Sequence, residues 1–294
     1  MQTFTLQNDQ LRVAIKQTGA ELASIYSPLQ KQEYVWQADP QYWKRHSSIL
    51  FPIVGKLAND AYRLEEKAYH LPQHGFARDM NFTLVHQDEK NLKLQLKDSE
   101  ETLKAYPFPF QFDAIYALEK NKLFITYEIT NPGEEPLWFS LGAHPAFNVP
   151  VLPDTRRSDY GLRFETAETT DRLLIVDGLR TGASQRILED AQLLPITDDL
   201  FDQDALIFTS LRSEELSLIG PGDQEIWKFG FSGFPYLGIW SKSKDAPFVC
   251  IEPWHGVADE TGYEGPFHLK DGIIALPGKA EFTCTHWVEI VQAP

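Results

Sequence analysis

The chain has 294 residues, 43% of them hydrophobic and 23% charged, which is typical of a folded globular protein and excludes a disordered one. Acidic residues outnumber basic ones by 42 to 27, and the resulting net charge of −15 repels a phosphate backbone, so we expect no nucleic-acid partner. Two cysteines, Cys250 and Cys284, are too few for a disulfide framework and are compatible with a reducing compartment.

The N-terminal segment 1–19 alternates apolar and polar residues and lacks the basic start and unbroken apolar stretch of a signal peptide. No stretch approaches the ~18 apolar residues that a membrane-spanning helix needs. We therefore expect a cytoplasmic protein without a membrane partner.

Most of the chain alternates apolar and polar residues with the period of a β-strand, in runs rich in Val, Ile, Phe, Tyr and Thr. In chain order, the expected strands are Thr3–Leu6, Leu11–Ile15, Leu22–Tyr26, Leu92–Leu96, Phe112–Leu118, Leu123–Ile129, Leu137–Leu141, Leu216–Ile219, Tyr236–Ser241, Phe248–Ile251 and Phe282–Val291. Lys120 and Asn121 predict a hairpin turn between two of these runs. Helical signals are confined to Ser99–Ala105, one or two turns that Pro107 ends.

The sequence contains no linker, no low-complexity segment and no repeat of fixed period. More than ten strands in one undivided chain predict a single all-β domain, residues 1–294, built as a large antiparallel sandwich. The segment Arg156–Asp199 is the least periodic part, and we expect it to form long connections. Its three arginines, Arg156, Arg157 and Arg163, form the most basic local patch of the sequence. We expect this patch to be part of a solvated loop.

Several common catalytic motifs are absent from the sequence, among them a glycine-rich phosphate loop, a GxSxG elbow and a CxxC pair. His70 and His74 have the spacing of a metal site on a helix, but Pro72 lies between them and disfavours a helix. We therefore expect no zinc site.

His144 and Glu252 stand out because each follows a predicted strand and immediately precedes a proline. The proline ring restricts the residue before it to extended geometry, so a rigid strand end would aim each side chain. A histidine and a glutamate held in this way among apolar residues are candidates for an acid and a base. Alone, each signal is weak, because a single histidine beside small apolar residues is more often structural.

Together with the segment around His74, these motifs resemble the aldose 1-epimerase (galactose mutarotase) family, in particular its LacX-like branch. The resemblance runs over nearly the whole chain. Its segments are Gly19-Ala20-Glu21-Leu22, Leu50-Phe51-Pro52-Ile53-Val54-Gly55-Lys56-Leu57, His74-Gly75-Phe76-Ala77-Arg78, Gly142-Ala143-His144-Pro145-Ala146-Phe147 and Ile251-Glu252-Pro253-Trp254. It implies a mostly antiparallel β-supersandwich with an open sugar cleft and catalysis without a metal or organic cofactor.

The family interconverts the α and β anomers of aldoses by opening and reclosing the sugar ring. A base removes the proton of the anomeric O1 hydroxyl while an acid protonates the ring oxygen. The resemblance implies that Glu252 is the base and His144 the acid. It also implies that His74 hydrogen-bonds near the ring oxygen and stabilises the developing charge.

The resemblance also implies a set of sugar-binding residues. Asp204 matches the carboxylate that binds sugar hydroxyls, with Asp202 as a competitor for that role. Trp254 and Phe147 adjoin the motifs, where each is suited either to stack on the apolar face of a pyranose or to pack in the core. Lys56 is positioned to reach a hydroxyl.

Departures from the family pattern leave the substrate open. Lys56 replaces an arginine of the galactose-specific branch and lacks its planar fork, and Asp60 stands where a second arginine is expected. The residues after His74 resemble those of hexose-6-phosphate mutarotases. We expect a mutarotase for a free hexose such as galactose or glucose.

Two alternatives remain. The first is a hexose-6-phosphate mutarotase that holds the phosphate with Arg78 or with the patch of Arg156, Arg157 and Arg163. Against this, Arg78 is also suited to a structural ion pair with Asp79. The second is a carbohydrate-binding protein without turnover. The sequence does not distinguish a monomer from a homodimer.

Overall fold

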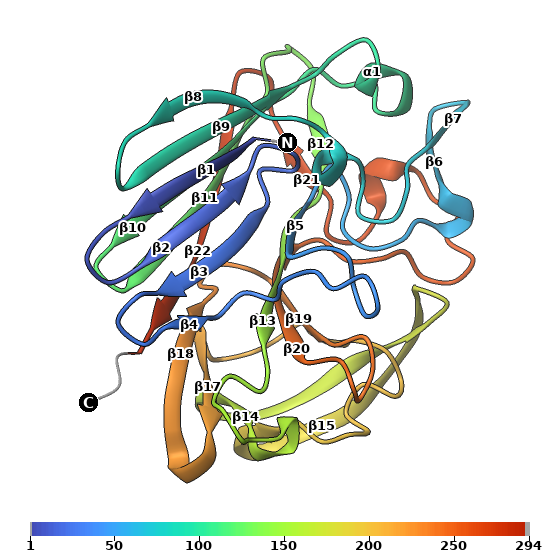
Figure 1. Ribbon diagram of the computed structural model, residues 1–294. Coiled ribbons are helices and arrows are strands. Elements are labelled where there is room, and N and C mark those ends of the chain that lie inside the picture. The colour runs from blue at the N-terminus through green and yellow to red at the C-terminus, as the bar shows by residue number, and fades with distance from the viewer. Residues whose placement is uncertain (1, 292–294) are drawn as a thin grey trace.

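The computed structural model describes residues 2–291 and is dominated by β-strands (Figure 1). The first half of the chain forms β1 (Thr3–Gln7), β2 (Arg12–Lys16), β3 (Leu22–Ser27), β4 (Gln32–Glu33), β5 (Ser47–Leu50), β6 (Ala61–Leu64), β7 (Lys67–His70), β8 (Thr83–Gln87), β9 (Asn91–Lys97), the short helix α1 (Thr102–Ala105), β10 (Gln111–Glu119) and β11 (Lys122–Thr130). The second half forms β12 (Leu137–Phe139), β13 (Leu141–Asn148), β14 (Gly161–Val176), β15 (Leu179–Pro195), β16 (Leu206–Phe208), β17 (Glu215–Gly220), β18 (Gln224–Gly230), β19 (Tyr236–Trp240), β20 (Phe248–His255), β21 (Ile274–Leu276) and β22 (Glu281–Ile290). Among the helices of residues 2–291, none has the length and apolar character needed to cross a membrane.

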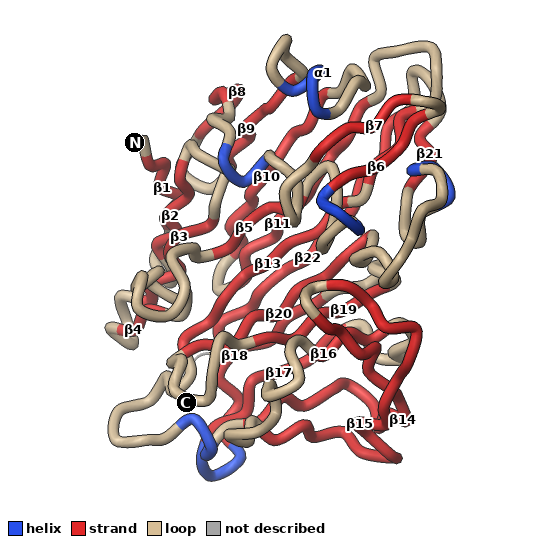
Figure 2. The backbone as a smooth tube through the Cα atoms, turned by 90° about the vertical axis from the view of Figure 1, so that its right-hand side faces the viewer, coloured by secondary structure: helices blue, strands red, loops and turns tan. Residues whose placement is uncertain are grey.

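The strands form one 14-stranded antiparallel sheet, a four-stranded sheet and two small two-stranded sheets. The large sheet runs in the order β5-β13-β20-β19-β16-β14-β17-β18-β22-β11-β10-β9-β8, with β15 paired to β14 (Figure 2). Strands β1 to β4 form the second sheet, which lies against the part of the large sheet that contains β9 to β11 (Figure 1). This arrangement confirms the predicted all-β fold of antiparallel sheets.

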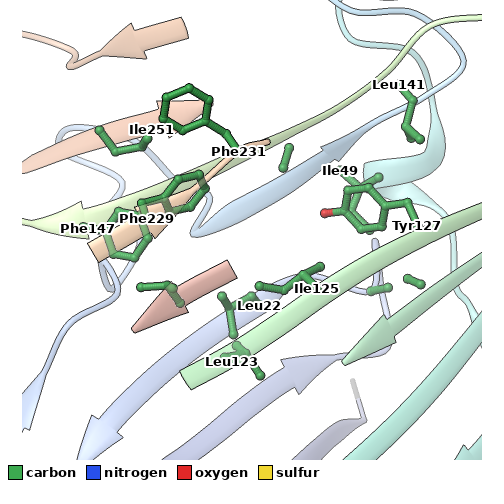
Figure 3. Packing of buried hydrophobic residues seen from close by; sticks show 14 of the residues in the cluster. Leu22, Ile49, Leu123, Ile125, Tyr127, Leu141, Phe147, Phe229, Phe231 and Ile251 are labelled. Atoms are coloured by element: carbon green, nitrogen blue, oxygen red, sulfur yellow. The ribbon is translucent and has the colours of Figure 1, made fainter. Parts of the chain in front are cut away.

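The core lies beneath the large sheet and the four-stranded sheet that packs on it, and many strands bury one face there. Along β11, Leu123, Ile125, Tyr127 and Ile129 are buried, whereas the residues between them are half-exposed. Such alternation follows from strand geometry, since successive side chains point to opposite faces. Figure 3 shows buried side chains from several strands of both sheets that pack together in this core. Its labelled members are Leu22, Ile49, Leu123, Ile125, Tyr127, Leu141, Phe147, Phe229, Phe231 and Ile251.

The hairpin turn expected at Lys120 and Asn121 is confirmed, with Lys120 in the left-handed region at φ 53°. Helix α1 lies within the helical segment that the sequence predicts. The prediction for Arg156–Asp199 is wrong: most of this segment is the long hairpin of β14 and β15. The pairing of these two strands shifts register four times, and each shift interrupts the period-two alternation by which a strand is recognised.

A buried carboxylate, Glu21, ties the four-stranded sheet to the large one. Its Oε1 accepts hydrogen bonds from the backbone N–H groups of His46 at 2.8 Å and Ser47 at 3.3 Å, and its Oε2 lies 3.1 Å from Lys16 Nζ. Burial raises the pKa of Glu21, but the bonds from His46 and the charge of Lys16 outweigh burial and lower the pKa to about 2. Ser47 begins β5, the neighbour of β13, so Glu21 fixes the edge of the large sheet.

We expect the substitution Glu21→Ala to lower the free energy of unfolding by about 3 kcal/mol at neutral pH, because it leaves two buried N–H groups and an ammonium without their acceptor. A lowered carboxyl pKa stabilises the fold above the unfolded value and loses this effect as the pH falls toward about 2. The difference from the wild type should therefore shrink below about pH 4. Urea denaturation checks this, with the exposed Glu119→Ala as control; equal stability of all three proteins would refute it.

Candidate active site

His144 and Glu252 face each other on two neighbouring strands, β13 and β20, which lie next to the edge strand β5 of the large sheet. Strands β13 and β20 pair in the same register before and after these residues, which places His144 opposite Glu252. Pro145 and Pro253 carry no N–H, and the paired ladder is interrupted between them. Both residues were expected at strand ends, but they lie within strands, because the prolines remove ladder donors without ending either strand.

The two side chains form a buried acid–base pair. His144 Nε2 lies 3.3 Å from Glu252 Oε2, and the residues are 8% and 2% exposed. Burial raises the pKa of Glu252 well above its usual range, and the charge of Asp204 raises it further. Burial lowers the pKa of His144 to about 3, and the positive charges of Arg78 and Arg45 act in the same direction. Burial therefore favours the neutral form of each group. In this state one proton lies between Glu252 Oε2 and His144 Nε2, in addition to the N–H of the neutral imidazole.

Aromatic rings enclose the imidazole of His144. Trp43 stacks on it with ring centroids 4.7 Å apart and an interplanar angle of 24°, and Trp240 contacts it edge-on at 5.6 Å. These rings replace water around the imidazole and fix its orientation. No motif in the sequence marks either residue: Trp43 lies in an irregular loop without a periodic signal, and Trp240 is the last residue of β19.

His74 reaches the same place from a tight turn. It adopts φ 66°, and Gly75 follows at φ 69°. A Cβ atom on Gly75 would lie 2.3 Å from the carbonyl oxygen of Phe51, so this turn requires glycine. The ring centroid of His74 lies 5.7 Å from that of His144.

Hydrogen bonding assigns the protonation state of His74. The backbone N–H of Gly55 donates to His74 Nδ1 at 3.1 Å, so Nδ1 is an acceptor and the ring proton resides on Nε2. Burial, with the nearby His144 and Arg78, lowers the pKa of His74 well below its usual value. His74 is therefore a neutral hydrogen-bond donor.

The pair and His74 line an open cleft of about 830 Å³. The walls come from the loop after β5, the tip of the β14–β15 hairpin, the segment 201–205 and β19 to β20. The structure brings together most of the residues predicted from the sequence. These are Glu252, His144, His74, Lys56, Arg78, Asp204 and Trp254, with Asp202 beside them.

Phe147 is the exception and is not part of the cleft. It is fully buried in the core, with its ring centroid 4.7 Å from that of Trp227. The reason is strand parity: His144 and Phe147 are three residues apart on β13, so their side chains point to opposite faces of the sheet. The predicted sugar-binding role of Phe147 is wrong.

Trp254 lies against the backbone of the strands on either side of its own. A Cβ atom on Gly142 or Gly238 would lie 2.6 Å from the Trp254 ring. Glycine at these two positions is what allows the indole to lie against both neighbouring strands where it lines the cleft.

The predicted basic patch does not contribute to the cleft. Arg157 is buried, and its guanidinium donates to the backbone carbonyls of Ser243, Lys244 and Ala246. Arg163 pairs with Asp223. The cationic side chains that line the cleft are Lys56, Arg78 and Lys242. Arg156 is exposed in a loop as expected, but the three arginines do not form one solvated patch, and none of them lines this cleft.

Arg78 is partly engaged by its own segment. Its guanidinium donates to the backbone carbonyl of Gln73 at 2.6 Å, and its Nε lies 3.8 Å from Asp79 Oδ2. Arg45 makes the closer ion pair with Asp79, at 2.9 Å. The expected ion pair of Arg78 is therefore weak, and part of its guanidinium faces the cleft.

The fold is that of galactose mutarotase-like proteins. The crystal structure of a galactose mutarotase related enzyme from Lactobacillus acidophilus superimposes with a TM-score of 0.94 at 34% sequence identity, covering 99% of this chain and 98% of that one. The profile of the aldose 1-epimerase family matches residues 2–264.

Curated relatives give the same answer. The plasmid-encoded LacX protein of Lactococcus lactis subsp. lactis is 32% identical over 265 residues, which cover 87% of this chain and 88% of LacX. A candidate glucose-6-phosphate 1-epimerase of Escherichia coli (strain K12) is 24% identical over 92% of this chain and 89% of its own length. The chain belongs to the aldose 1-epimerase family, and the expected isomerase class is confirmed.

We expect His144 and His74 to remain neutral between about pH 5 and 8, whereas an unperturbed imidazole titrates within that range. The physical reason is burial, reinforced by the nearby arginines. Nitrogen NMR of the imidazole rings, assigned with His144→Asn and His74→Asn, measures this. A titration of either ring with a midpoint near 6.5 would contradict the electrostatic description of the site.

Proposed function

We propose that the protein interconverts the α and β anomers of a free hexose such as galactose or glucose, with Glu252 as the base and His144 as the acid. The observation that carries this proposal is the buried pair with 3.3 Å between His144 Nε2 and Glu252 Oε2 at the floor of a cleft large enough for a sugar. The reaction needs one group to accept the O1 proton and another to protonate the ring oxygen, and this pair supplies both.

The position of the proton shared by Glu252 and His144 determines which group acts as base and which as acid. In the reactive arrangement Glu252 is ionised and His144 is protonated. The carboxylate takes the proton from O1–H, the imidazolium gives its proton to O5, the C1–O5 bond breaks and a C1=O1 carbonyl forms. Rotation about C1–C2 then presents the other carbonyl face to O5, and both protons return as the ring closes.

This cycle ends each ring opening with a neutral carboxyl group and a neutral imidazole. Burial favours these same forms of Glu252 and His144, so the site is electrostatically matched to the open-chain intermediate. The charged arrangement is reached by moving one proton over the short distance between the two side chains. His74, fixed as an Nε2–H donor, is suited to hydrogen-bond the ring oxygen as negative charge develops there.

The charges of the cleft favour a neutral sugar. Four aspartates line it besides Glu252, namely Asp60, Asp177, Asp202 and Asp204. A phosphate group would face this negative field as well as the overall charge of −15. Of the cations in the wall, Lys56 donates to the backbone carbonyl of Asp177 at 3.3 Å and Arg78 to that of Gln73. The four aspartates, in contrast, are suited to accept hydrogen bonds from the hydroxyl groups of a neutral sugar.

One observation favours hexose 6-phosphate as a second candidate substrate. Arg78 lines the cleft, and after burial its charge and that of the nearby Arg45 also lower the pKa of both His74 and His144, so positive charge lies close to these histidines. The relative from Escherichia coli carries the name of an epimerase of this substrate. A binding protein without turnover is disfavoured, because burying an acid–base pair is costly unless its chemistry is used. We also propose a cytoplasmic location, which the two free thiols support.

We expect Glu252→Gln to retain the fold and to lower the rate of mutarotation by at least about 100-fold, the usual scale for the loss of a general base. Polarimetry of freshly dissolved α-glucose and α-galactose measures the rate, and the exposed Glu119→Gln serves as control. A folded Glu252→Gln protein with nearly normal turnover would remove Glu252 from this role.

His144→Asn and His74→Asn should both reduce kcat, and the loss should be larger for His144. A group that donates a proton in the transition state contributes more than one that only stabilises charge. The same polarimetric assay compares the two variants. Equal losses, or a larger loss at His74, would show that the two roles are exchanged.

Glucose should be a better substrate than glucose 6-phosphate, judged by kcat/KM at low and high salt. The excess of carboxylates in the cleft is the reason. Arg78→Ala tests the alternative, with Arg163→Ala as a control outside the cleft. A preference for the phosphate that weakens with salt and disappears in Arg78→Ala would replace this substrate with the phosphorylated one.

A further inference from the structure

A buried thiol lies directly beside the acid–base pair. Cys250 precedes Glu252 by two residues on β20, so both side chains point to the same face of the sheet. A nitrogen of His144, the sulfur of Cys250 and a carboxylate oxygen of Glu252 all lie within 4.8 Å of one another. Cys250 is fully buried, and the register pairs it with the small Ala146 on β13.

Two atoms of this cluster have unused hydrogen-bonding capacity. His144 Nδ1 is buried and has no hydrogen-bond partner within the described residues 2–291, and Glu252 Oε2 has no neighbour to bond besides His144 Nε2, 3.3 Å away. Buried polar atoms without full hydrogen bonding are rare in folded proteins and often mark the place where a ligand or ion binds. Here they accompany a third donor, the Cys250 sulfur, which the proposed sugar chemistry does not use.

The three donors are those that zinc prefers. Thiolate, imidazole and carboxylate together select Zn²⁺ over Mg²⁺ or Ca²⁺, which prefer oxygen ligands. Around one tetrahedral zinc the donor atoms would lie about 3.3–3.6 Å apart, so the 4.8 Å limit requires side-chain movements of about 1 Å. His144 and Glu252 also line the cleft, which leaves a fourth position open to water.

We propose that His144, Cys250 and Glu252 form a site for Zn²⁺, and that the ion inhibits the enzyme by occupying its acid and its base. A metal on these side chains removes both lone pairs that the sugar reaction needs and blocks the cleft floor. The inhibitory part rests on the proposed function, whereas the binding part does not. Metal and sugar should therefore exclude one another.

Cobalt(II), a spectroscopic substitute for zinc, tests binding without reference to activity. We expect Co²⁺ added to the full-length protein to give a thiolate-to-cobalt charge-transfer absorption band. The band should vanish in Cys250→Ser and persist in Cys284→Ser, which alters the other thiol of the chain. The absence of the band in the wild type, or its persistence in Cys250→Ser, would overturn the proposal.

Inhibition is tested by polarimetry with Zn²⁺, each variant being compared with its own metal-free rate. The zinc concentration for half-inhibition should rise at least about tenfold in Cys250→Ser, since even losing a group that merely orients a ligand costs about 10- to 100-fold in affinity. Mg²⁺ should not inhibit, and added sugar should protect. Equal zinc sensitivity of wild type and Cys250→Ser would overturn the proposal. If the wild type turned over no sugar, the proposed function would fail, and the cobalt spectrum would still decide the metal site.

Discussion

The site depends on the register between β13 and β20, which sets a histidine opposite a glutamate in the interior of a wide sheet. Both strands have neighbours on each side, so neither can slip by one residue without turning the pair from the cleft into the core. Strand β5, held by Glu21, supports β13, and β19 supports β20. The prolines after His144 and Glu252 have no backbone N–H, so two hydrogen-bond donors of the strand ladder are missing where these side chains meet.

Burial then gives this pair its chemical character. In water a histidine and a glutamate would both be charged over part of the physiological range, whereas the enclosing rings of Trp43 and Trp240 and the depth of the sheet favour neutral forms. In the proposed reaction, such a pair becomes an ion pair only at the step in which the sugar requires charged groups. His74 adds a fixed donor whose proton position is set by the backbone of Gly55. The same closeness that would allow proton transfer also places Cys250 near enough to join the proposed metal site.

Much of the fold could be predicted from the sequence, because strands such as β10 and β11 alternate without interruption. The hairpin of β14 and β15 could not, since its bulges break the alternation. For the site, the residue-before-proline pattern and the family motifs identified His144, Glu252 and His74. The wrong role for Phe147 follows from the expectation that a strand ends at Leu141. Because β13 continues to Asn148, the alternation of side chains along it directs Phe147 into the core. The same parity argument places Cys250 beside Glu252. Trp43 carries no such signal, since only the folded loop brings it to His144.

The central claim is that His144 and Glu252 act as one unit that shares a proton. Groups that act as a unit are strongly non-additive, because removing either one already abolishes the shared step. The most direct test is therefore a double-variant cycle, in which kcat is measured by polarimetry for Glu252→Gln, His144→Asn and the double variant. The shared-proton mechanism predicts that the double variant is about as slow as the slower single variant. Losses that multiply would show two independent groups and would contradict it.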